Sequence, residues 1–198
     1  MDIRATKRYL RRELLARRAQ VEDRAVRSAQ IAHHVLALPA FQAAYAIHCY
    51  LAIGSEVETA YLISAALTQG KAVVVPVVTD DGRLRHSWIR DIDMADFTTG
   101  SHGTLIPRRI IPALPGDWDL TFVPLLGFDR QGYRIGYGKG YYDQLLGAAT
   151  TYAVGLAFQA QECPFIPHEP HDRRLDLVVT EEGVGEIVAS PSLPLLSL

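Results

Sequence analysis

Short apolar runs alternate with helical segments along most of the chain. The runs have the length of strands and carry β-branched residues; they lie at 44–52, 72–78, 120–126, 152–157 and 175–180. Segments of helical periodicity at about 57–69 and 141–149 separate several of these runs. Strands that alternate with helices are typical of βαβ units. The pattern therefore predicts an α/β fold with a mostly parallel sheet covered by helices on both faces.

Two helices are predicted before the first strand. The first spans residues 3–20, because Ile3, Leu10 and Leu14 recur on one of its sides. Basic side chains at helical spacing form a stripe on it, namely Arg4, Lys7, Arg8 and Arg11. This stripe is either a solvated surface or a binding face. The second helix runs over about residues 22–38, and Pro39 is expected to stop it.

The remaining segments are less regular. Residues 83–89 predict a further strand, since apolar and aromatic side chains alternate there with Arg85 and Ser87. Residues 90–116 lose this periodicity and predict a long irregular connection, of a kind that often carries function. The tail after Ser190 is expected to be frayed or loosely docked.

The composition is that of an ordinary soluble domain. Of the 198 residues, 48% are hydrophobic and 21% are charged, with a formal net charge of −2, which excludes a disordered or nucleic-acid-coating chain. This length suits a single domain over residues 1–198. Cys49 and Cys163 lie far apart without a CxxC motif, and no segment reaches the roughly 20 apolar residues of a membrane span. No signal peptide is expected, so we predict a cytoplasmic protein without a membrane partner.

Positive charge is concentrated at the front of the chain. Residues 1–30 contain nine Lys/Arg and four Asp/Glu, a balance of +5, which leaves −7 for the remainder. A basic first helix can bind RNA. The acidic remainder and the lack of an aromatic-basic surface motif argue against that function, so we expect no nucleic-acid partner.

Candidate chemistry is concentrated in residues 124–143, which follow a buried-looking strand and open a helix. Three alternating glycines there let the backbone approach a ligand, namely Gly136, Gly138 and Gly140. The free N–H groups of a helix start favour anions, and Arg134 and Lys139 add positive charge, so phosphate is the ligand that fits. The segment is not a P-loop, because Tyr133 occupies the first glycine position and Gly140 replaces the magnesium-binding Ser/Thr. A tight strand-to-helix turn is the structural alternative.

With three further motifs, this segment resembles the 5-formyltetrahydrofolate cyclo-ligase family, also called methenyltetrahydrofolate synthetases. The motifs follow the family order over most of the chain: Lys7-Arg-Tyr-Leu-Arg11, Glu56-Val-Glu-Thr59, residues 124–143, and His168-Glu-Pro-His171-Asp172 with Leu175-Asp176. The resemblance implies a three-layer α/β fold. It also implies that ATP and Mg²⁺ are used to convert 5-formyltetrahydrofolate to 5,10-methenyltetrahydrofolate, with release of ADP and phosphate.

The resemblance also implies roles for individual residues. The ATP-binding set is Lys7, Arg11, Arg134, Gly136, Gly138, Lys139, Gly140 and Tyr142. Within it, Arg134 and Lys139 are expected to be catalytic, by neutralising charge during phosphoryl transfer. The folate-binding set is Leu51, Glu56, Tyr137, Lys139 and Tyr141. Asp143 and Asp172 are the expected magnesium ligands, because Mg²⁺ prefers oxygen and usually takes one or two carboxylates beside substrate phosphates.

Structural alternatives exist for the acidic residues. Asp143 can be a solvated acid in the first turn of a helix, and Asp172 can be a turn or cap residue. Ser55 and Glu58 fit a capping box for the next helix, which explains Glu58 but not Glu56. The His-rich motif that contains Asp172 also invites a zinc interpretation, but its prolines and the lack of a nearby cysteine argue against one.

Two departures from the family pattern bear on the function. Tyr137 stands where the family often has arginine, which removes a possible phosphate contact. Residues 103–109 differ from the Gly-Ile-Pro-Glu-Pro-like run that is thought to line the folate pocket. Two other functions therefore stay open: a folate- or nucleotide-binding regulator without turnover, and a sugar-phosphate isomerase or CoA-transferase relative of the same architecture. We expect small-molecule substrates as partners, and a monomer.

Overall fold

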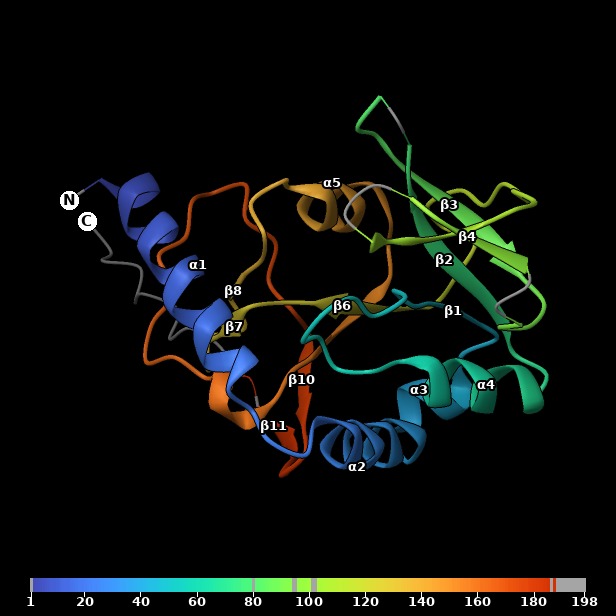
Figure 1. Cartoon of the computed structure of the whole chain (residues 1–198), viewed down its shortest axis with the longest axis horizontal. Coiled ribbons are helices and arrows are strands. Elements are labelled where there is room, and N and C mark those ends of the chain that lie inside the picture. The colour runs from blue at the N-terminus through green and yellow to red at the C-terminus, as the bar shows by residue number, and fades with distance from the viewer. Residues whose placement is uncertain (1, 80, 94–95, 101–102, 186, 188–198) are drawn as a thin grey trace, which may run out of the picture.

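A seven-stranded sheet forms the centre of the molecule (Figure 1). The computed structural model describes residues 2–187 except 80, 94–95, 101–102 and 186. The strands follow the order β11-β10-β9-β6-β1-β2-β3. Their bounds are β1 Ala46–His48, β2 Ala72–Val78, β3 Leu84–Ile89, β6 Leu120–Pro124, β9 Tyr152–Leu156, β10 Leu177–Thr180 and β11 Gly183–Gly185. Only the edge strands β3 and β11 run antiparallel to their neighbours, which confirms the predicted mostly parallel sheet.

Helices cover both faces of this sheet, as predicted. α2 (Arg24–Leu36), α3 (Pro39–Ala43) and α4 (Ala60–Thr68) lie along one face, and α5 (Tyr141–Ala148) lies on the other (Figure 1). α1 (Ile3–Ala19) lies across the side of the molecule and contacts the short helix η3 (Gln159–Gln161). The result is a three-layer α/β arrangement. None of the described helices is long and apolar enough to cross a membrane.

The central strands are apolar along their length because both of their faces are buried. Val73 and Val75 belong to the core cluster beneath α2 and α4, whereas Val74 packs in a second cluster with Leu145 of α5. Parallel sheets covered on both faces have such continuous apolar runs. Length and β-branching, rather than alternation, therefore identify these strands in the sequence.

Two hairpins lie where no strand was predicted. β4 (Phe97–Thr99) pairs with β5 (Leu105–Pro107), so the prediction that residues 90–116 are irregular is wrong in part. β7 (Gly127–Phe128) pairs with β8 (Arg134–Ile135) around a turn. Strands of two or three residues are too short to give a periodic signal, and cross-strand partners alone define them.

Pro39 begins a helix instead of only ending one. α2 ends at Leu36, and Pro39 is the first residue of α3. Proline fits there because the amide that it lacks would have no partner in the first turn. The second predicted helix is therefore shorter than residues 22–38. The predicted loosely docked tail after Ser190 lies outside the described residues.

The chain changes its winding direction between β1 and β6. These strands are parallel neighbours, yet the helix that follows β1, α4, covers one face and the helix that follows β6, α5, covers the other (Figure 1). In open α/β sheets, ligands bind outside the carboxyl ends of the strands at such a switch point. The connections that leave β1 and β6 contain most of the expected site residues.

Candidate active site

A polar cavity of about 380 Å³ opens between α1, the glycine-rich segment and the loop before β10. Its lining contains the basic stripe of α1, two of the alternating glycines and both expected magnesium ligands: Arg4, Lys7, Arg8, Arg11, Gly138, Gly140, Asp143, Glu169, His171 and Asp172. The packing of α1 against these loops therefore brings the first and last family motifs together at one place.

Lys7 is buried in the wall of this cavity. Only 9% of the residue is exposed, and its Nζ lies 2.6 Å from Asp172 Oδ2 and 3.2 Å from Glu169 Oε2. Burial by itself would raise the pKa of Asp172, but hydrogen bonds from Lys7 and from the Glu169 amide outweigh it and lower the pKa. The Asp172 carboxylate is therefore ionised at neutral pH. Lys7 does not belong to a solvated surface, unlike the exposed Arg4 and Arg8.

Arg134 and Asp143 form a second charged pair. Arg134 Nη2 lies 2.8 Å from Asp143 Oδ1, and its Nη1 donates to the carbonyl of Arg173. The Arg134 side chain is 6% exposed and the Asp143 side chain 31% exposed, so the carboxylate is the more accessible partner. An expected catalytic cation is thus bonded to an expected metal ligand, one from β8 and the other from the first turn of α5.

Arg11 holds the glycine-rich segment against α1. Its Nε donates to the Gly136 carbonyl at 3.0 Å. At position 138, a Cβ would stand 3.0 Å from the guanidinium carbon of Arg11, and the backbone there has a φ of +93°. The left-handed conformation favours glycine at position 138, and a side chain there would have to displace the Arg11 guanidinium. The close contact places a cation directly beside backbone that is expected to bind phosphate.

The oxygen donors of the cavity suit a hard cation. Asp143 and Asp172 both line it, and Mg²⁺ usually takes one or two carboxylates together with substrate phosphates. Among the described residues, no group of three or more His, Cys, Asp or Glu is arranged to hold a metal by itself. The His168 ring of the candidate zinc motif instead stacks on Tyr133 at 3.5 Å between ring centroids. The donor set therefore fits a magnesium ion that binds with phosphate groups.

Glu56 and Tyr137 lie together beyond the carboxyl ends of β1 and β6. Glu56 is 6% exposed, and its Oε2 accepts a hydrogen bond from the Ile53 amide at 3.0 Å. Burial raises the pKa of Glu56, and the Ile53 amide, the charge of Arg18 and the nearby Tyr137 hydroxyl oppose this rise in part. Tyr137 is about half exposed. Two expected folate ligands are therefore neighbours at the switch point of the sheet.

Arg18 belongs to this site although the sequence analysis did not single it out. It is 1% exposed, and its Nε donates to Ser55 Oγ at 3.1 Å. The predicted capping box at Ser55 is wrong, because α4 begins later, after Thr59. The Ser55 hydroxyl oxygen instead accepts the hydrogen bond from Arg18. The buried residues of α1 are Lys7, Leu14 and Arg18, whose spacing along one helical face was the available signal.

The other expected site residues have varied surroundings. Leu51 is partly buried against the main core, Lys139 is exposed on its loop, and the Tyr141 hydroxyl donates to the Gly82 carbonyl at 2.9 Å. The Tyr142 hydroxyl is buried without a hydrogen-bond partner among the described residues, and burial raises its pKa. Tyr142 therefore lies in the core beneath the site and does not line the polar cavity.

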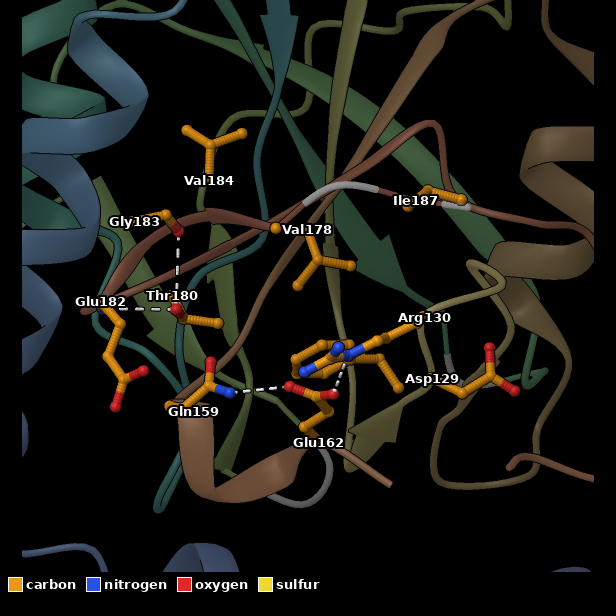
Figure 2. A pocket seen from close by; sticks show the side chains of 12 residues that line it. Asp129, Arg130, Gln159, Glu162, Val178, Thr180, Glu182, Gly183, Val184 and Ile187 are labelled. Atoms are coloured by element: carbon orange, nitrogen blue, oxygen red, sulfur yellow. Dashed lines mark hydrogen bonds and ion pairs between the residues drawn. The ribbon is translucent and has the colours of Figure 1, made fainter. Parts of the chain in front are cut away.

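A second cavity, of about 330 Å³, lies against β10 and β11. Figure 2 shows Arg130 and Gln159 directed at the same carboxylate, that of Glu162, and both are 2.7 Å from its oxygens. The hydrogen bond from Arg130 lowers the pKa of Glu162. Arg130 and Glu162 thus satisfy each other, and none of the expected site residues is in the lining. We therefore place the candidate active site in the polar cavity and the adjoining switch point.

Comparisons with known proteins agree with the resemblance. The model of the 5-formyltetrahydrofolate cyclo-ligase family matches residues 3–181. The 5-formyltetrahydrofolate cyclo-ligase of Mus musculus is 33% identical over 205 residues, which cover 92% of this chain and 97% of that protein.

Two solved structures share the fold. The NMR structure of Aquifex aeolicus 5,10-methenyltetrahydrofolate synthetase has a TM-score of 0.80 and 29% identity, over 94% of this chain and 95% of that chain. The structure of a 5,10-methenyltetrahydrofolate synthetase from Mycoplasma pneumoniae has a TM-score of 0.71 and 25% identity, over 92% and 100% of the two chains. The family motifs, the architecture and the relatives agree, and this chain belongs to the 5-formyltetrahydrofolate cyclo-ligase family.

Proposed function

We propose that this protein uses ATP to convert 5-formyltetrahydrofolate to 5,10-methenyltetrahydrofolate, with ADP and phosphate as the other products. The observation that carries the proposal is the polar cavity, in which Lys7 and Arg11 share the lining with Asp143 and Asp172. Glu56 and its neighbours add a second site for an organic substrate at the switch point. A ligase that phosphorylates its substrate needs both kinds of site.

On the nucleotide side, cations and backbone amides receive the phosphates. The positive charges are those of Lys7, Arg11, Arg134 and Lys139, and the amides are those of Gly136, Gly138 and Gly140. Lys7 and Arg134 are each bonded to a carboxylate, so incoming phosphates replace carboxylates with groups of the same charge. Tyr142 supports the start of α5 from the core.

Asp143 and Asp172 would hold Mg²⁺ together with the phosphates. The ion would neutralise charge on the transferring phosphoryl group. Both carboxylates gain access to it when their present partners, Arg134 and Lys7, turn to the phosphates.

On the folate side, Glu56 accepts hydrogen bonds from the donor-rich edge of the pterin. Its burial makes each such bond stronger than it would be in water. Tyr137 and Tyr141 offer aromatic faces and hydroxyl groups, Leu51 offers an apolar wall, and Lys139 lies between the two substrates.

The reaction needs alignment and charge neutralisation rather than a protein nucleophile. The formyl oxygen attacks the γ-phosphorus of ATP and ADP leaves. N10 then attacks the activated formyl carbon and gives up its proton, the carbon–oxygen bond breaks, and phosphate leaves as the five-membered ring closes. We assign neutralisation of the transferring phosphoryl group to Arg134 and Lys139.

The protein is expected to act as a monomer in the cytoplasm. Cys49 and Cys163 are both free and buried, as suits a reducing compartment. Sedimentation at several protein concentrations would test the monomer, and fractionation of cells would test the location.

Assay of the purified protein with 5-formyltetrahydrofolate tests the function. We expect the methenyl product only when ATP and Mg²⁺ are both present, with one ADP released for each product. Binding of both substrates without turnover would favour a regulator instead. Product formed without ATP would exclude the ligase mechanism.

A further inference from the structure

The guanidinium of Arg18 occupies an unusual position for an arginine. With 1% of the residue exposed, its Nε donates to Ser55 Oγ at 3.1 Å and its Nη1 donates to the Leu125 carbonyl at 3.0 Å. Its Nη2 donates to the Tyr137 hydroxyl, and the guanidinium carbon lies 5.5 Å from the centroid of that ring. All three hydrogen-bond acceptors are uncharged, so none of them neutralises the positive charge of Arg18.

The positive charge of Arg18 acts on the nearby carboxyl group of Glu56. Both groups are buried, and the charge of Arg18 favours the ionised form of the carboxyl group. Tyr137 is coupled to both, since its hydroxyl accepts from Arg18 and also favours the ionised form of the Glu56 carboxyl group. A buried charge without compensation is strongly unfavourable, which means that these three groups depend on one another.

We propose that Arg18 is a positioning residue for the folate side of the site, which fixes the Tyr137 hydroxyl and the Glu56 carboxylate in the geometry that receives the pterin. This inference rests on the proposed function, in which Glu56 and Tyr137 face the folate. It also gives α1 two tasks, because Lys7 and Arg18 lie on the same buried face of that helix. The helix thereby fixes the nucleotide cavity relative to the folate pocket.

Because titratable groups surround Glu56, the proposal can be tested by measuring folate binding as a function of pH. Arg18 faces Glu56 from α1, Tyr137 from the glycine-rich segment, Tyr50 from the loop after β1 and Tyr142 from α5. Arg18 is the only cation among these four, and it holds down a pKa that burial raises. Without Arg18 the pKa of Glu56 rises further, so the carboxylate is protonated at a higher pH.

The variants Arg18→Met and Arg18→Lys test the role, with Arg17→Met as the matched control. Arg17 is the adjacent residue on α1 and is exposed, and its hydrogen bonds among the described residues go to the carbonyls of Ala160 and Glu162, outside the site. We expect Arg18→Met to raise the KM for 5-formyltetrahydrofolate by about tenfold or more, the effect of losing a hydrogen bond to a charged group, with a much smaller change in the KM for ATP. Arg18→Lys should restore part of this loss, because the charge remains while the three-way fork of donors is lost.

The pH dependence of folate binding distinguishes a positioning role of Arg18 from a purely structural role. In the Arg18→Met protein, the pH below which folate binding weakens should move upward, whereas the control variant should keep the wild-type profile. An Arg18 variant that folds, as judged by circular dichroism, and keeps the wild-type folate KM and pH profile would overturn the proposal.

Tyr137→Phe keeps the test decisive if the Arg18→Met protein does not fold. This change removes one hydroxyl from a half-exposed ring. We expect it to weaken folate binding, and to weaken it less in the Arg18→Lys background, because both changes break the same contact. Effects that multiply independently would contradict the proposal. Calorimetry of folate binding without nucleotide keeps this result apart from the proposed function, since binding is measured whether or not the wild-type protein turns over.

Discussion

α1 delivers positive charge to two regions of the molecule, and the two regions use it differently. In the polar cavity, Lys7 is bonded to the carboxylates of Asp172 and Glu169 beside an opening. Near the other end of the same helix, Arg18 is bonded to uncharged acceptors and is closed off from solvent. The residue type is similar, and the surroundings decide its task.

This difference indicates which of the two cations, Lys7 or Arg18, can bind a ligand directly. A carboxylate beside an opening can give way to a phosphate, because the ligand offers the same charge and the same hydrogen bonds. A guanidinium enclosed by neutral acceptors has no such replacement, so it fixes geometry instead. One helix therefore serves an exchangeable site and a rigid site.

Removal of Lys7 should have the largest effect on the exchangeable region. Lys7→Ala takes away a buried cation, the proposed phosphate partner, and leaves Asp172 and Glu169 facing the same space. We expect kcat/KM for ATP to fall by about 100-fold, since loss of one partner from a buried charge pair costs about 2–5 kcal/mol. Steady-state kinetics measures this loss, and Arg12→Ala on the exposed face of α1 is the control. A similar loss in both variants would show that the effect is not specific to the cavity.

Asp143→Asn should raise the magnesium requirement. Asparagine keeps one acceptor oxygen but loses the charge that a hard divalent ion prefers, so we expect half-maximal activity to need about tenfold more Mg²⁺. Excess Mg²⁺ should rescue part of the rate, and folate binding without nucleotide should change little. Wild-type magnesium dependence would remove Asp143 from the metal site and leave Asp172 as the carboxylate ligand.

Glu56→Gln should weaken folate binding without loss of stability. Burial raises the pKa of Glu56 in the folded protein, so the folded state takes up a proton more readily than the unfolded state. The contribution of Glu56 to the free energy of unfolding therefore increases as the pH falls through its raised pKa. Gln is neutral at every pH, so Glu56→Gln should not lower the free energy of unfolding at neutral pH.

The same variant should change the pH profile of folate binding. Wild-type affinity should fall as the pH drops through the raised pKa of Glu56, whereas the Gln variant should bind about tenfold more weakly with little dependence on pH. Calorimetry at several pH values tests both expectations. Glu58→Gln, two residues along and exposed, is the control and should behave like the wild type.

The smallest effect is expected at the rim of the cavity. Arg8 lines the cavity but is exposed, so its attraction for phosphate is screened by salt. Arg8→Ala should raise the KM for ATP by roughly threefold at low ionic strength, and the difference should vanish near about 0.5 M salt. A large effect that survives high salt would mean that Arg8 makes a direct contact as Lys7 does.

The sequence by itself determined the family and the order of the layers. Strand length, β-branching and helical periodicity are local properties, so the five parallel strands and the helices between them could be predicted. The motif residues Lys7, Arg11, Asp143 and Asp172 could be selected because each stands in a motif of the family that the sequence resembles. The structure brings all four into the lining of one cavity.

Only the tertiary structure decided which partner each charged group has. Periodicity indicates which side of α1 is buried, but the loops that cover that side come from distant parts of the chain. It therefore could not show that Lys7 meets Asp172, that Arg134 meets Asp143, or that Arg18 reaches Ser55. The hairpins β4–β5 and β7–β8 are undetermined locally for the same reason, because their strands exist only through pairing. Burial and pairing set the charge state and the freedom of a side chain, and both are properties of the assembled fold rather than of the local sequence.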